Sequence, residues 1–526
     1  MILKEISPTG LGNMALDYSN IQSVDTYHNP LQGPSDGQLI HALNTISFPN
    51  GGISKRGGYR TFLNKPDSAQ VNALFAFPFQ QGTQINLYRA AGSLLYYSLQ
   101  GTANWVLAQG STGTDAGGTI VNNAYVDSAV LNGTMIIADG GTPRHTINGT
   151  TFSNTVGAPL GAQYMTNYHQ RIYASDGTSS NFTYSSYGSA DNWNIALPAD
   201  SSSFTIPGPG AVTKSFVAGD RLLIPKNKGA LFNWDDITLV DTSTTFGPTS
   251  PKSITQIDDY WFYIHQLGMF GHDGANKQLI SAPIQRMFYN KLGVAVSGVN
   301  LINSGNALGA TLYWDYLAVV GNINDDFTGK IINNAIIKYD YQKNTFTYWQ
   351  MSDFPTAITS YYDQNGHQQM IFGNATGDVF QYDPGATSDN TAAIPSEMIF
   401  MFTYASQGSS FTPTSASSVT GSSWQKRWKY YRAFFTPGCE MNVQFAFSDS
   451  MDPQRLRWSE AFNTRQVAGP NDYWQFSDGT LEIRFPNDSN NLPRSRFLFI
   501  RLYESSDSSQ WTLFSQQVDA EPQLIG

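Results

Sequence analysis

The feature that most constrains the fold is a short hairpin pattern that recurs between Val71 and Pro384. In each copy a strand of β-branched or aromatic residues reaches a turn of Gly, Asn or Asp, and a second aromatic-rich strand returns. A spacing of about 35–45 residues is typical of one β-propeller blade per repeat. The pattern therefore predicts a ring of small antiparallel sheets. Clear copies begin at Leu131, His169, Ala218, Asp258, Asn333 and His367.

The number of repeats indicates about seven blades, which is within the range of about 4–8 that propellers use. Six or eight blades also stay open, because the first unit and the long connection between the fifth and sixth units fit the pattern least well. The predicted units begin near Val71, Thr119, Gln163, Val212, Ser253, Ala307 and Ala357.

The distribution of strand and turn patterns along the chain predicts three regions. Residues 1–67 lack regular patterning and predict an irregular arm, or a segment that lends a strand to close the ring. They include one predicted short helix, SDGQLIHALNTI, with Ser35 as its N-cap. Residues 68–388 form the predicted propeller. Residues 389–526 contain alternating runs such as MNVQFAF, which predict a C-terminal β-sandwich.

Composition limits the classes of function. Charged residues make up 13% of the 526 residues, about half the usual share, and such a surface suits permanent assemblies because few charges lose water at an interface. A net charge of −10 argues against a dedicated nucleic-acid binder, which needs clustered Lys and Arg. The single cysteine, Cys439, indicates folding in a reducing cytoplasm. We expect no secretory signal, because the start MILKEISPTGLGNMALDY has no apolar h-region. We expect no membrane insertion, because no apolar run approaches about 20 residues.

No motif predicts catalysis, a cofactor or a metal site. The seven histidines lack HxH or HxxxH spacing, so surface or turn histidines are favoured over metal ligands. Three pairs of adjacent aspartates suggest a glycosidase, which needs two carboxylates facing one sugar. Neighbouring residues on a strand point to opposite faces, so caps of turns explain these pairs better. The pairs are Asp235–Asp236, Asp258–Asp259 and Asp325–Asp326.

Two basic motifs stand out against the acidic background and supply the candidate contact residues. GGISKRGGYRTF and SSWQKRWKYYRAF both mix cations with aromatic residues. A solvated strand with cation–aromatic contacts is the first interpretation, a subunit contact rich in Arg, Tyr and Trp is the second, and a grip on nucleic acid is the last. The candidate residues are Lys55, Arg56, Arg60, Lys426, Arg427, Lys429 and Arg432.

The second motif also predicts which side chains share a face. If it is a regular strand, side chains alternate strictly between its two faces. One face would then carry Trp428 together with Tyr430, Lys426 and Arg432, and the opposite face would carry Arg427, Lys429 and Tyr431.

These motifs resemble the tail hub, or nozzle, proteins of short-tailed bacteriophages, a group that includes packaged-DNA stabilisation and tail tubular proteins. The likeness rests on ISFPNGGISKRGGYRTF, on the chain of divergent blades, and on WQKRWKYYRAFFTPGCEMNVQFAFSDSMDPQRLRW with the sandwich that ends in RFLFIRLYE. Gly57 stands where many relatives have Pro. The resemblance spans nearly the whole chain and consists of a texture plus two short motifs.

The resemblance implies a structural virion protein without enzymatic activity or cofactors. It implies a homo-oligomeric ring, a hexamer, mounted below the portal and its adaptor. Such a ring would retain packaged DNA, conduct it during ejection, and offer attachment points to tail fibres, spikes or a plug. It would assemble in the cytoplasm of the host bacterium and end up in the virion tail.

The charge agrees with that role. Six copies at −10 each would carry roughly −60 in total, so the ring would not retain a polyanion through its net charge. Genomic double-stranded DNA would pass without sequence-specific binding. Because the channel of a propeller is narrow, we expect the DNA path to lie on the ring axis between subunits.

A second hypothesis is a carbohydrate-binding or carbohydrate-cleaving propeller, such as a receptor-binding fibre or a depolymerase. Sugars stack on exposed Trp and Tyr, and this chain has 11 Trp and 28 Tyr. A glycan array or a reducing-sugar assay separates the two hypotheses.

Overall fold

A computed structural model gives the fold of the chain. It describes residues 14–18, 38–48, 52–79, 84–99, 104–111, 117–194, 201–236, 238–242, 246–288, 305–325, 330–403, 426–450, 455–466, 474–485, 494–505 and 510–522. These ranges include two short 3-10 helices, η2 (Pro251–Ser253) and η3 (Ala282–Met287). Among the same residues there is no helix with the length and apolarity to cross a bilayer.

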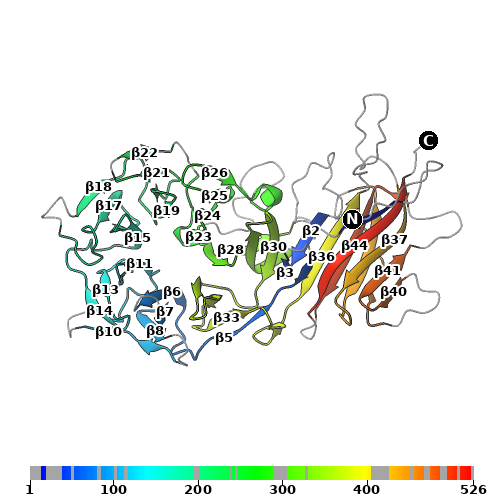
Figure 1. Cartoon of the computed structure of the whole chain (residues 1–526), viewed down its shortest axis with the longest axis horizontal. Helices are drawn as coiled ribbons and strands as arrows, with labels where there is room; N and C mark the ends of the chain where they lie inside the picture. Colours follow the sequence, from blue (N-terminus) through cyan, green and yellow to red (C-terminus); the bar gives the residue numbers. More distant parts are fainter. Residues whose placement is uncertain are drawn as a thin grey trace.

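Seven antiparallel sheets of the described residues surround a common axis (Figure 1). Within each blade the consecutive strands pair in chain order from the axis outward, because turns return the chain beside the strand it has just left. Strands β10 and β5, from earlier in the chain, join the outer edges of two blades. The first strands of neighbouring blades contact one another, as β27 does with β31. The predicted all-β fold with a propeller of about seven blades is confirmed.

The first blade contains β6 (Val71–Phe79), β7 (Gln84–Ala91), β8 (Leu94–Leu99) and β9 (Val106–Leu107), and the second contains β11 (Asp127–Leu131), β12 (Thr134–Ala138), β13 (Arg144–Thr146) and β14 (Thr151–Asn154), with β10 (Gln109–Gly110) on its outer edge. The third blade contains β15 (Tyr164–Tyr168), β16 (Arg171–Ser175), β17 (Asn181–Tyr184) and β18 (Ser202–Thr205). The fourth blade contains β19 (Phe216–Ala218), β20 (Arg221–Pro225), β21 (Leu231–Trp234) and β22 (Leu239–Asp241).

The fifth blade contains β23 (Thr255–Ile257), β24 (Tyr260–His265), β25 (Gly268–His272) and β26 (Lys277–Leu279). The sixth blade contains β27 (Leu308–Leu312), β28 (Asp315–Asn324), β29 (Ile331–Asp340) and β30 (Thr345–Gln350). The seventh blade contains β31 (Ala357–Tyr362), β32 (Gln368–Gly373) and β33 (Val379–Asp383) and is completed by β5 (Gly58–Thr61), with β34 (Ser388–Asp389) and β35 (Ala392–Ala393) beyond β5.

The ring is closed by a strand from the N-terminal part of the chain. β5 pairs antiparallel with β33, and Tyr59 lies opposite Tyr382. The Tyr59 ring is fully buried against Phe372 and Phe380. Gly58 is needed here because a Cβ at this position would come within 1.8 Å of the Ser388 carbonyl oxygen. The seventh blade is therefore built from both ends of the propeller sequence.

The C-terminal half packs two sheets face to face. One sheet has the order β3-β4-β44-β37-β41-β40, with β1 also paired to β44 and β42 to β37. The other sheet continues blade six in the order β30-β2-β36-β43-β38-β39. These strands are β1 (Met14–Tyr18), β2 (Gln38–Leu43), β3 (Thr45–Ser47), β4 (Ile53–Lys55), β36 (Ser396–Thr403), β37 (Lys426–Phe435), β38 (Asn442–Ser448), β39 (Phe462–Asn463), β40 (Trp474–Ser477), β41 (Thr480–Arg484), β42 (Arg494–Ser495), β43 (Phe497–Glu504) and β44 (Thr512–Pro522).

The predicted helix in SDGQLIHALNTI is wrong, because its residues 38–43 form strand β2; Ser35 lies outside the described residues. β2 pairs antiparallel with β36 and parallel with β30. Residues 39–42 are all buried, as expected for a strand covered on both faces. A run that is apolar on both faces loses the period-two alternation, so its sequence does not distinguish it from a helix.

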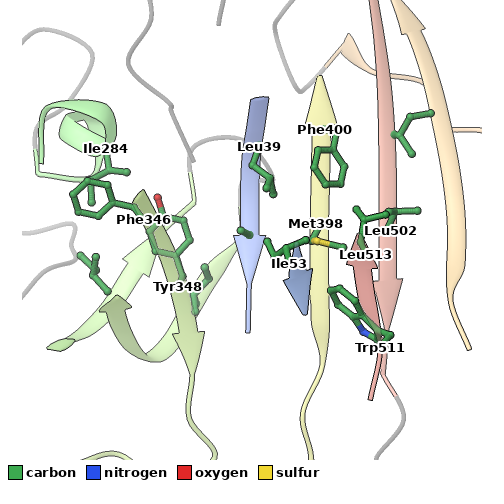
Figure 2. Close-up of a cluster of buried hydrophobic side chains, with 14 of the residues drawn as sticks. Leu39, Ile53, Ile284, Phe346, Tyr348, Met398, Phe400, Leu502, Trp511 and Leu513 are labelled. Atoms are coloured by element: carbon green, nitrogen blue, oxygen red, sulfur yellow. The ribbon is translucent and has the colours of Figure 1, made fainter. Parts of the chain in front are cut away.

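A single hydrophobic cluster joins the propeller to the sandwich. Figure 2 shows Phe346 and Tyr348 of β30 on one side, Leu39 of β2 in the middle, and Met398 and Phe400 of β36 beyond. The same cluster extends to the other sandwich sheet, where it includes Trp511 and Leu513. Burying a large apolar side chain contributes about 1.5–3 kcal/mol. The two halves of the molecule thus share one core rather than meeting at a linker.

Candidate functional site

The first basic motif lies inside the protein. The side chains of Lys55 and Arg56 have no exposed area. Lys55 Nζ lies 2.7 Å from Glu504 Oε2. Arg56 forms a bidentate pair with Asp389, with Nη1–Oδ1 and Nη2–Oδ2 distances of 2.7 and 2.6 Å. Buried charges need such partners because removing them from water is costly.

Arg56 also connects segments that are far apart in the sequence. Its Nε donates to Asn44 Oδ1 at 2.9 Å, and Nη2 donates to the Gln350 carbonyl oxygen at 2.7 Å. Asn44 follows β2, Gln350 ends β30 and Asp389 ends β34, so this guanidinium fastens the joint between propeller and sandwich. Arg60 differs, because its side chain is 71% exposed and pairs with Asp383 at 2.8 Å.

The second basic motif forms strand β37. Arg432 Nη2 lies 2.6 Å from Glu482 Oε2 on the neighbouring strand β41, and its guanidinium lies 5.5 Å from the centre of the Tyr430 ring. Arg427, Lys429 and Arg432 are partly exposed; the side chain of Lys426 lies outside the described residues. A contact with another subunit stays a prediction for all seven basic residues, and the exposed members of the set are the ones positioned to make it.

The predicted division of β37 into two faces is wrong at one point. The register against β44 shifts between Trp428 and Tyr430, which is the pattern of a β-bulge. Because the bulge inserts one residue, Trp428 and Tyr431 both face the core instead of opposite sides, and both are at most 1% exposed. Tyr430 and Arg432 do share a face.

The described residues also form an open cleft of about 860 Å³ between the third and fourth blades. This volume is in the range of small-molecule sites. Its centre is a two-residue turn, His169 and Gln170, between β15 and β16. Both residues have positive φ, at 44° and 59°, where turns of this kind prefer Asn-Gly. Non-glycine residues held there cost of order 1–3 kcal/mol each, so their surroundings must hold them in place.

The imidazole of His169 is held by two carboxylates of the fourth blade. Nδ1 lies 2.5 Å from Asp236 Oδ2, just after β21, and Nε2 lies 2.9 Å from Asp220 Oδ1, in the turn between β19 and β20. Burial lowers the pKa of His169, but the hydrogen bonds to Asp220 and Asp236 outweigh it, so the pKa is raised. When both ring nitrogens carry a proton, the ring donates to both carboxylates, and these hydrogen bonds connect the two blades.

Aromatic side chains form the walls of the cleft. The ring of Tyr168 stacks on His169 with 3.8 Å between centroids. The Tyr173 hydroxyl donates to Asp236 Oδ1 at 2.7 Å and accepts from Trp234 Nε1 at 3.3 Å. Tyr187 is 68% exposed at the edge.

Arg171 orders the exposed part of this wall. Its guanidinium carbon lies 5.0 Å from the centre of the Tyr184 ring and 5.8 Å from that of Tyr187, and Nη1 donates to the Ser185 carbonyl oxygen at 2.8 Å. Cation–π contacts of this kind contribute about 0.5–1 kcal/mol at exposed sites. These contacts favour one orientation of the two tyrosine rings.

The aspartate pairs have mixed roles. Asp235 caps its turn as predicted, accepting from the Thr238 backbone N–H at 2.6 Å. Its neighbour Asp236 enters the cleft instead, which sequence reasoning missed. One sequence signal could have indicated the site. His169 and Gln170 occupy a two-residue hairpin turn, where Asn-Gly is the preferred pair, so their presence is unusual. In the described part of the chain, no three His, Cys, Asp or Glu side chains are grouped to hold a metal ion.

The described side chains around the axis of the propeller line a small pocket. It lies among the first strands of the blades and has a volume of about 250 Å³, which is room for about eight water molecules. The Lys214 ammonium lies 2.6 Å from Asp127 Oδ1 beside it. This pocket is far too small for a nucleic-acid duplex.

Comparisons with known proteins leave the family open. No family model matches the sequence, and no curated protein matches it. Among solved structures, YCF48 from Cyanidioschyzon merolae is 10% identical, covering 62% of this chain and 99% of its own, with a TM-score of 0.39. BBS1N in complex with ARL6DN is 10% identical over 63% of this chain and 99% of its own, with a TM-score of 0.41. U3-55K is 9% identical over 62% of this chain and 98% of its own, with a TM-score of 0.40.

Proposed function

We propose that the protein is the hub or nozzle of a short phage tail, a structural virion protein that assembles into a ring of identical subunits. The observation that carries the proposal is the continuous joint between propeller and sandwich, where β2 pairs with β30 on one edge and with β36 on the other. The buried Arg56–Asp389 pair lies at the same joint. A subunit whose two parts share a strand and a hydrophobic cluster can transmit load between its neighbours, as a tube that holds packed DNA must do.

The proposed path of the DNA lies outside the axis of the propeller. Because the axial pocket is only about 250 Å³, double-stranded DNA would pass along the axis of the ring, between subunits. The net charge of −10 per chain favours passage over retention, since each Lys or Arg bound to phosphate would act as a brake.

The neighbours proposed for the ring are a portal–adaptor complex above it and tail fibres, spikes or a plug around it. Charged residues at the centre of an interface are few, and Arg, Tyr and Trp are enriched there. Arg60 and Arg432 are arginines with exposed side-chain surface. Arg60 lies beside Asp383, and Arg432 lies over the ring of Tyr430. We expect them to lie at subunit contacts.

The test is the symmetry of the assembled particle. Purified protein, alone at high concentration and mixed with a portal–adaptor complex, is imaged by negative stain, and its mass is measured by light scattering. We expect closed rings, with six copies each. Arg60→Ala combined with Arg432→Ala should reduce ring formation, whereas Arg221→Ala, at an exposed site on β20, should not. A protein that stays monomeric under both conditions would contradict the proposal.

A further inference from the structure

We infer that the cleft between the third and fourth blades is a binding site for a neutral oligosaccharide. The exposed ring of Tyr187, at 68%, and the partly exposed rings of Tyr184 and Trp234 line it. The carboxylates of Asp220 and Asp236 lie beside them. Flat rings with hydrogen-bonding groups around them fit the two surfaces of a sugar, whose C–H faces are apolar and whose edges carry hydroxyl groups. The inference does not depend on ring assembly.

The charges of the cleft favour a neutral ligand. Asp220 and Asp236 carry two negative charges. Arg171 and, when it is protonated, His169 supply positive charges in the same space. A phosphate or another anion would approach the two carboxylates, which disfavours nucleic acid. A quaternary ammonium group would use the faces of tyrosine rings, but the positive charge of Arg171 beside Tyr184 and Tyr187 would repel it.

The cleft is ordered in advance for such a ligand. The network of His169, Asp220 and Asp236 fixes two blades relative to each other, and Tyr173 and Trp234 are hydrogen-bonded within it. Asp220 is 94% exposed while it holds the imidazole, so its outer lone pairs can accept sugar hydroxyl groups. Binding thus orders few protein groups, which lowers its entropic cost.

The geometry favours binding over cleavage. Glycosidases place two carboxyl groups on either side of the bond they cleave. Here both carboxylates hold opposite nitrogens of one imidazole. Neither is placed as a separate acid or nucleophile, and the inferred role is recognition.

The experiment measures binding of maltohexaose, cellohexaose, mannohexaose and chitohexaose to the full chain by calorimetry, with phosphocholine as the cationic comparison. At least one hexasaccharide should bind with a sub-millimolar Kd. Tyr187→Ala should weaken that binding about tenfold, because it removes one stacking ring. Tyr187→Phe should bind within about threefold of wild type, since it keeps the ring.

Tyr362→Ala is the matched control, because Tyr362 is 62% exposed on the seventh blade and lies outside the cleft. It should bind as wild type does. The inference is overturned by failure of all four hexasaccharides at millimolar concentration, by tighter binding of phosphocholine, by unchanged affinity in Tyr187→Ala, or by equal loss in Tyr362→Ala. Ring formation is scored separately on Tyr187→Ala, so the failure of this inference and of the proposed function are distinguishable.

Discussion

At the scale of single residues, buried charges gather where the N-terminal segment meets the rest of the chain. Lys55 pairs with Glu504, and Arg56 pairs with Asp389. In strand β2, His41 pairs with Asp325. A buried pair costs desolvation energy, so its presence alone is weak evidence of stability, but removing one partner leaves a charge without compensation. These pairs make the joint sensitive to single substitutions.

Arg56→Ala should destabilise the protein by about 3–5 kcal/mol, because it leaves Asp389 buried beside empty space. Arg60→Ala, four residues along, should cost at most about 1 kcal/mol, since that pair is exposed to solvent. Both free energies of unfolding come from denaturant titration followed by tryptophan fluorescence. Equal losses in the two variants would contradict the structural role assigned to Arg56.

His41 makes the stability of the joint depend on pH. Burial lowers the pKa of His41, but the nearby carboxylates of Asp325 and Glu397 outweigh it, and the net pKa is raised above 6.5. The folded state therefore binds the proton more tightly than the unfolded chain. The stability that this proton contributes is complete below about pH 6.5 and is lost as the pH rises through the raised value.

The Tm difference between wild type and His41→Gln should accordingly be largest near pH 6 and shrink towards pH 9. Lys330, whose charge opposes protonation of His41, stays in both proteins. His367→Gln serves as the control, because its imidazole is 71% exposed, and the Tm should change little at any pH. A difference that grows with pH would show the opposite sign of linkage.

At the scale of elements, short strands from the N-terminal segment complete sheets whose other strands follow hundreds of residues later. β5 closes the seventh blade and β2 joins blade six to the sandwich. Each covers an edge that would otherwise expose unpaired backbone groups. The N-terminal strands therefore stabilise the two halves of the molecule together.

Gly58→Ala should disrupt ring closure, because its Cβ would lie 1.8 Å from the Ser388 carbonyl oxygen and backbone cannot easily move away. We expect a loss of about 3 kcal/mol or more and faster hydrogen exchange in β5 and β33. Gly271→Ala is the matched control, since its Cβ would meet Phe262 at 3.4 Å, an ordinary contact. Unchanged exchange in β33 of Gly58→Ala would count against closure by β5.

At the scale of the whole molecule, the shared core couples two architectures that usually fold apart. The hydrophobic cluster that contains Leu39 and Phe346 continues to Trp511 (Figure 2). Domains joined only by a linker commonly unfold in separate transitions. Here one cluster of buried side chains belongs to both parts of the molecule, so unfolding of either part exposes apolar surface of the other.

Differential scanning calorimetry should therefore give one unfolding peak for the intact chain. Leu39→Ala, at the joint, should lower the free energy of unfolding by about 2–5 kcal/mol. The single peak should therefore move to lower temperature as a whole, with propeller and sandwich unfolding together. Ile224→Ala, in the separate core of the third and fourth blades, should cost a similar amount. Two well-separated peaks for the wild type would show that the halves are independent.

The propeller and sandwich were predictable from sequence because their signals are local. A blade is a series of hairpins, so alternation and turn residues within about 40 positions identify it, and the predicted starts at Val71 and Ala357 coincide with β6 and β31. Burial of the β37 motif was only partly predictable, since a bulge at Lys429 changes which residues face inward.

The contacts between segments that are distant in the sequence were decided by the tertiary structure alone. Arg56 meets Asp389 across 333 positions, and His169 meets Asp236 across 67. The strand identity of β2 depends on pairing with β30 and β36, which no local pattern encodes. Sequence determines local periodicity directly, whereas these pairs form only because burial forces each charge and each open sheet edge to find a partner wherever the fold places one.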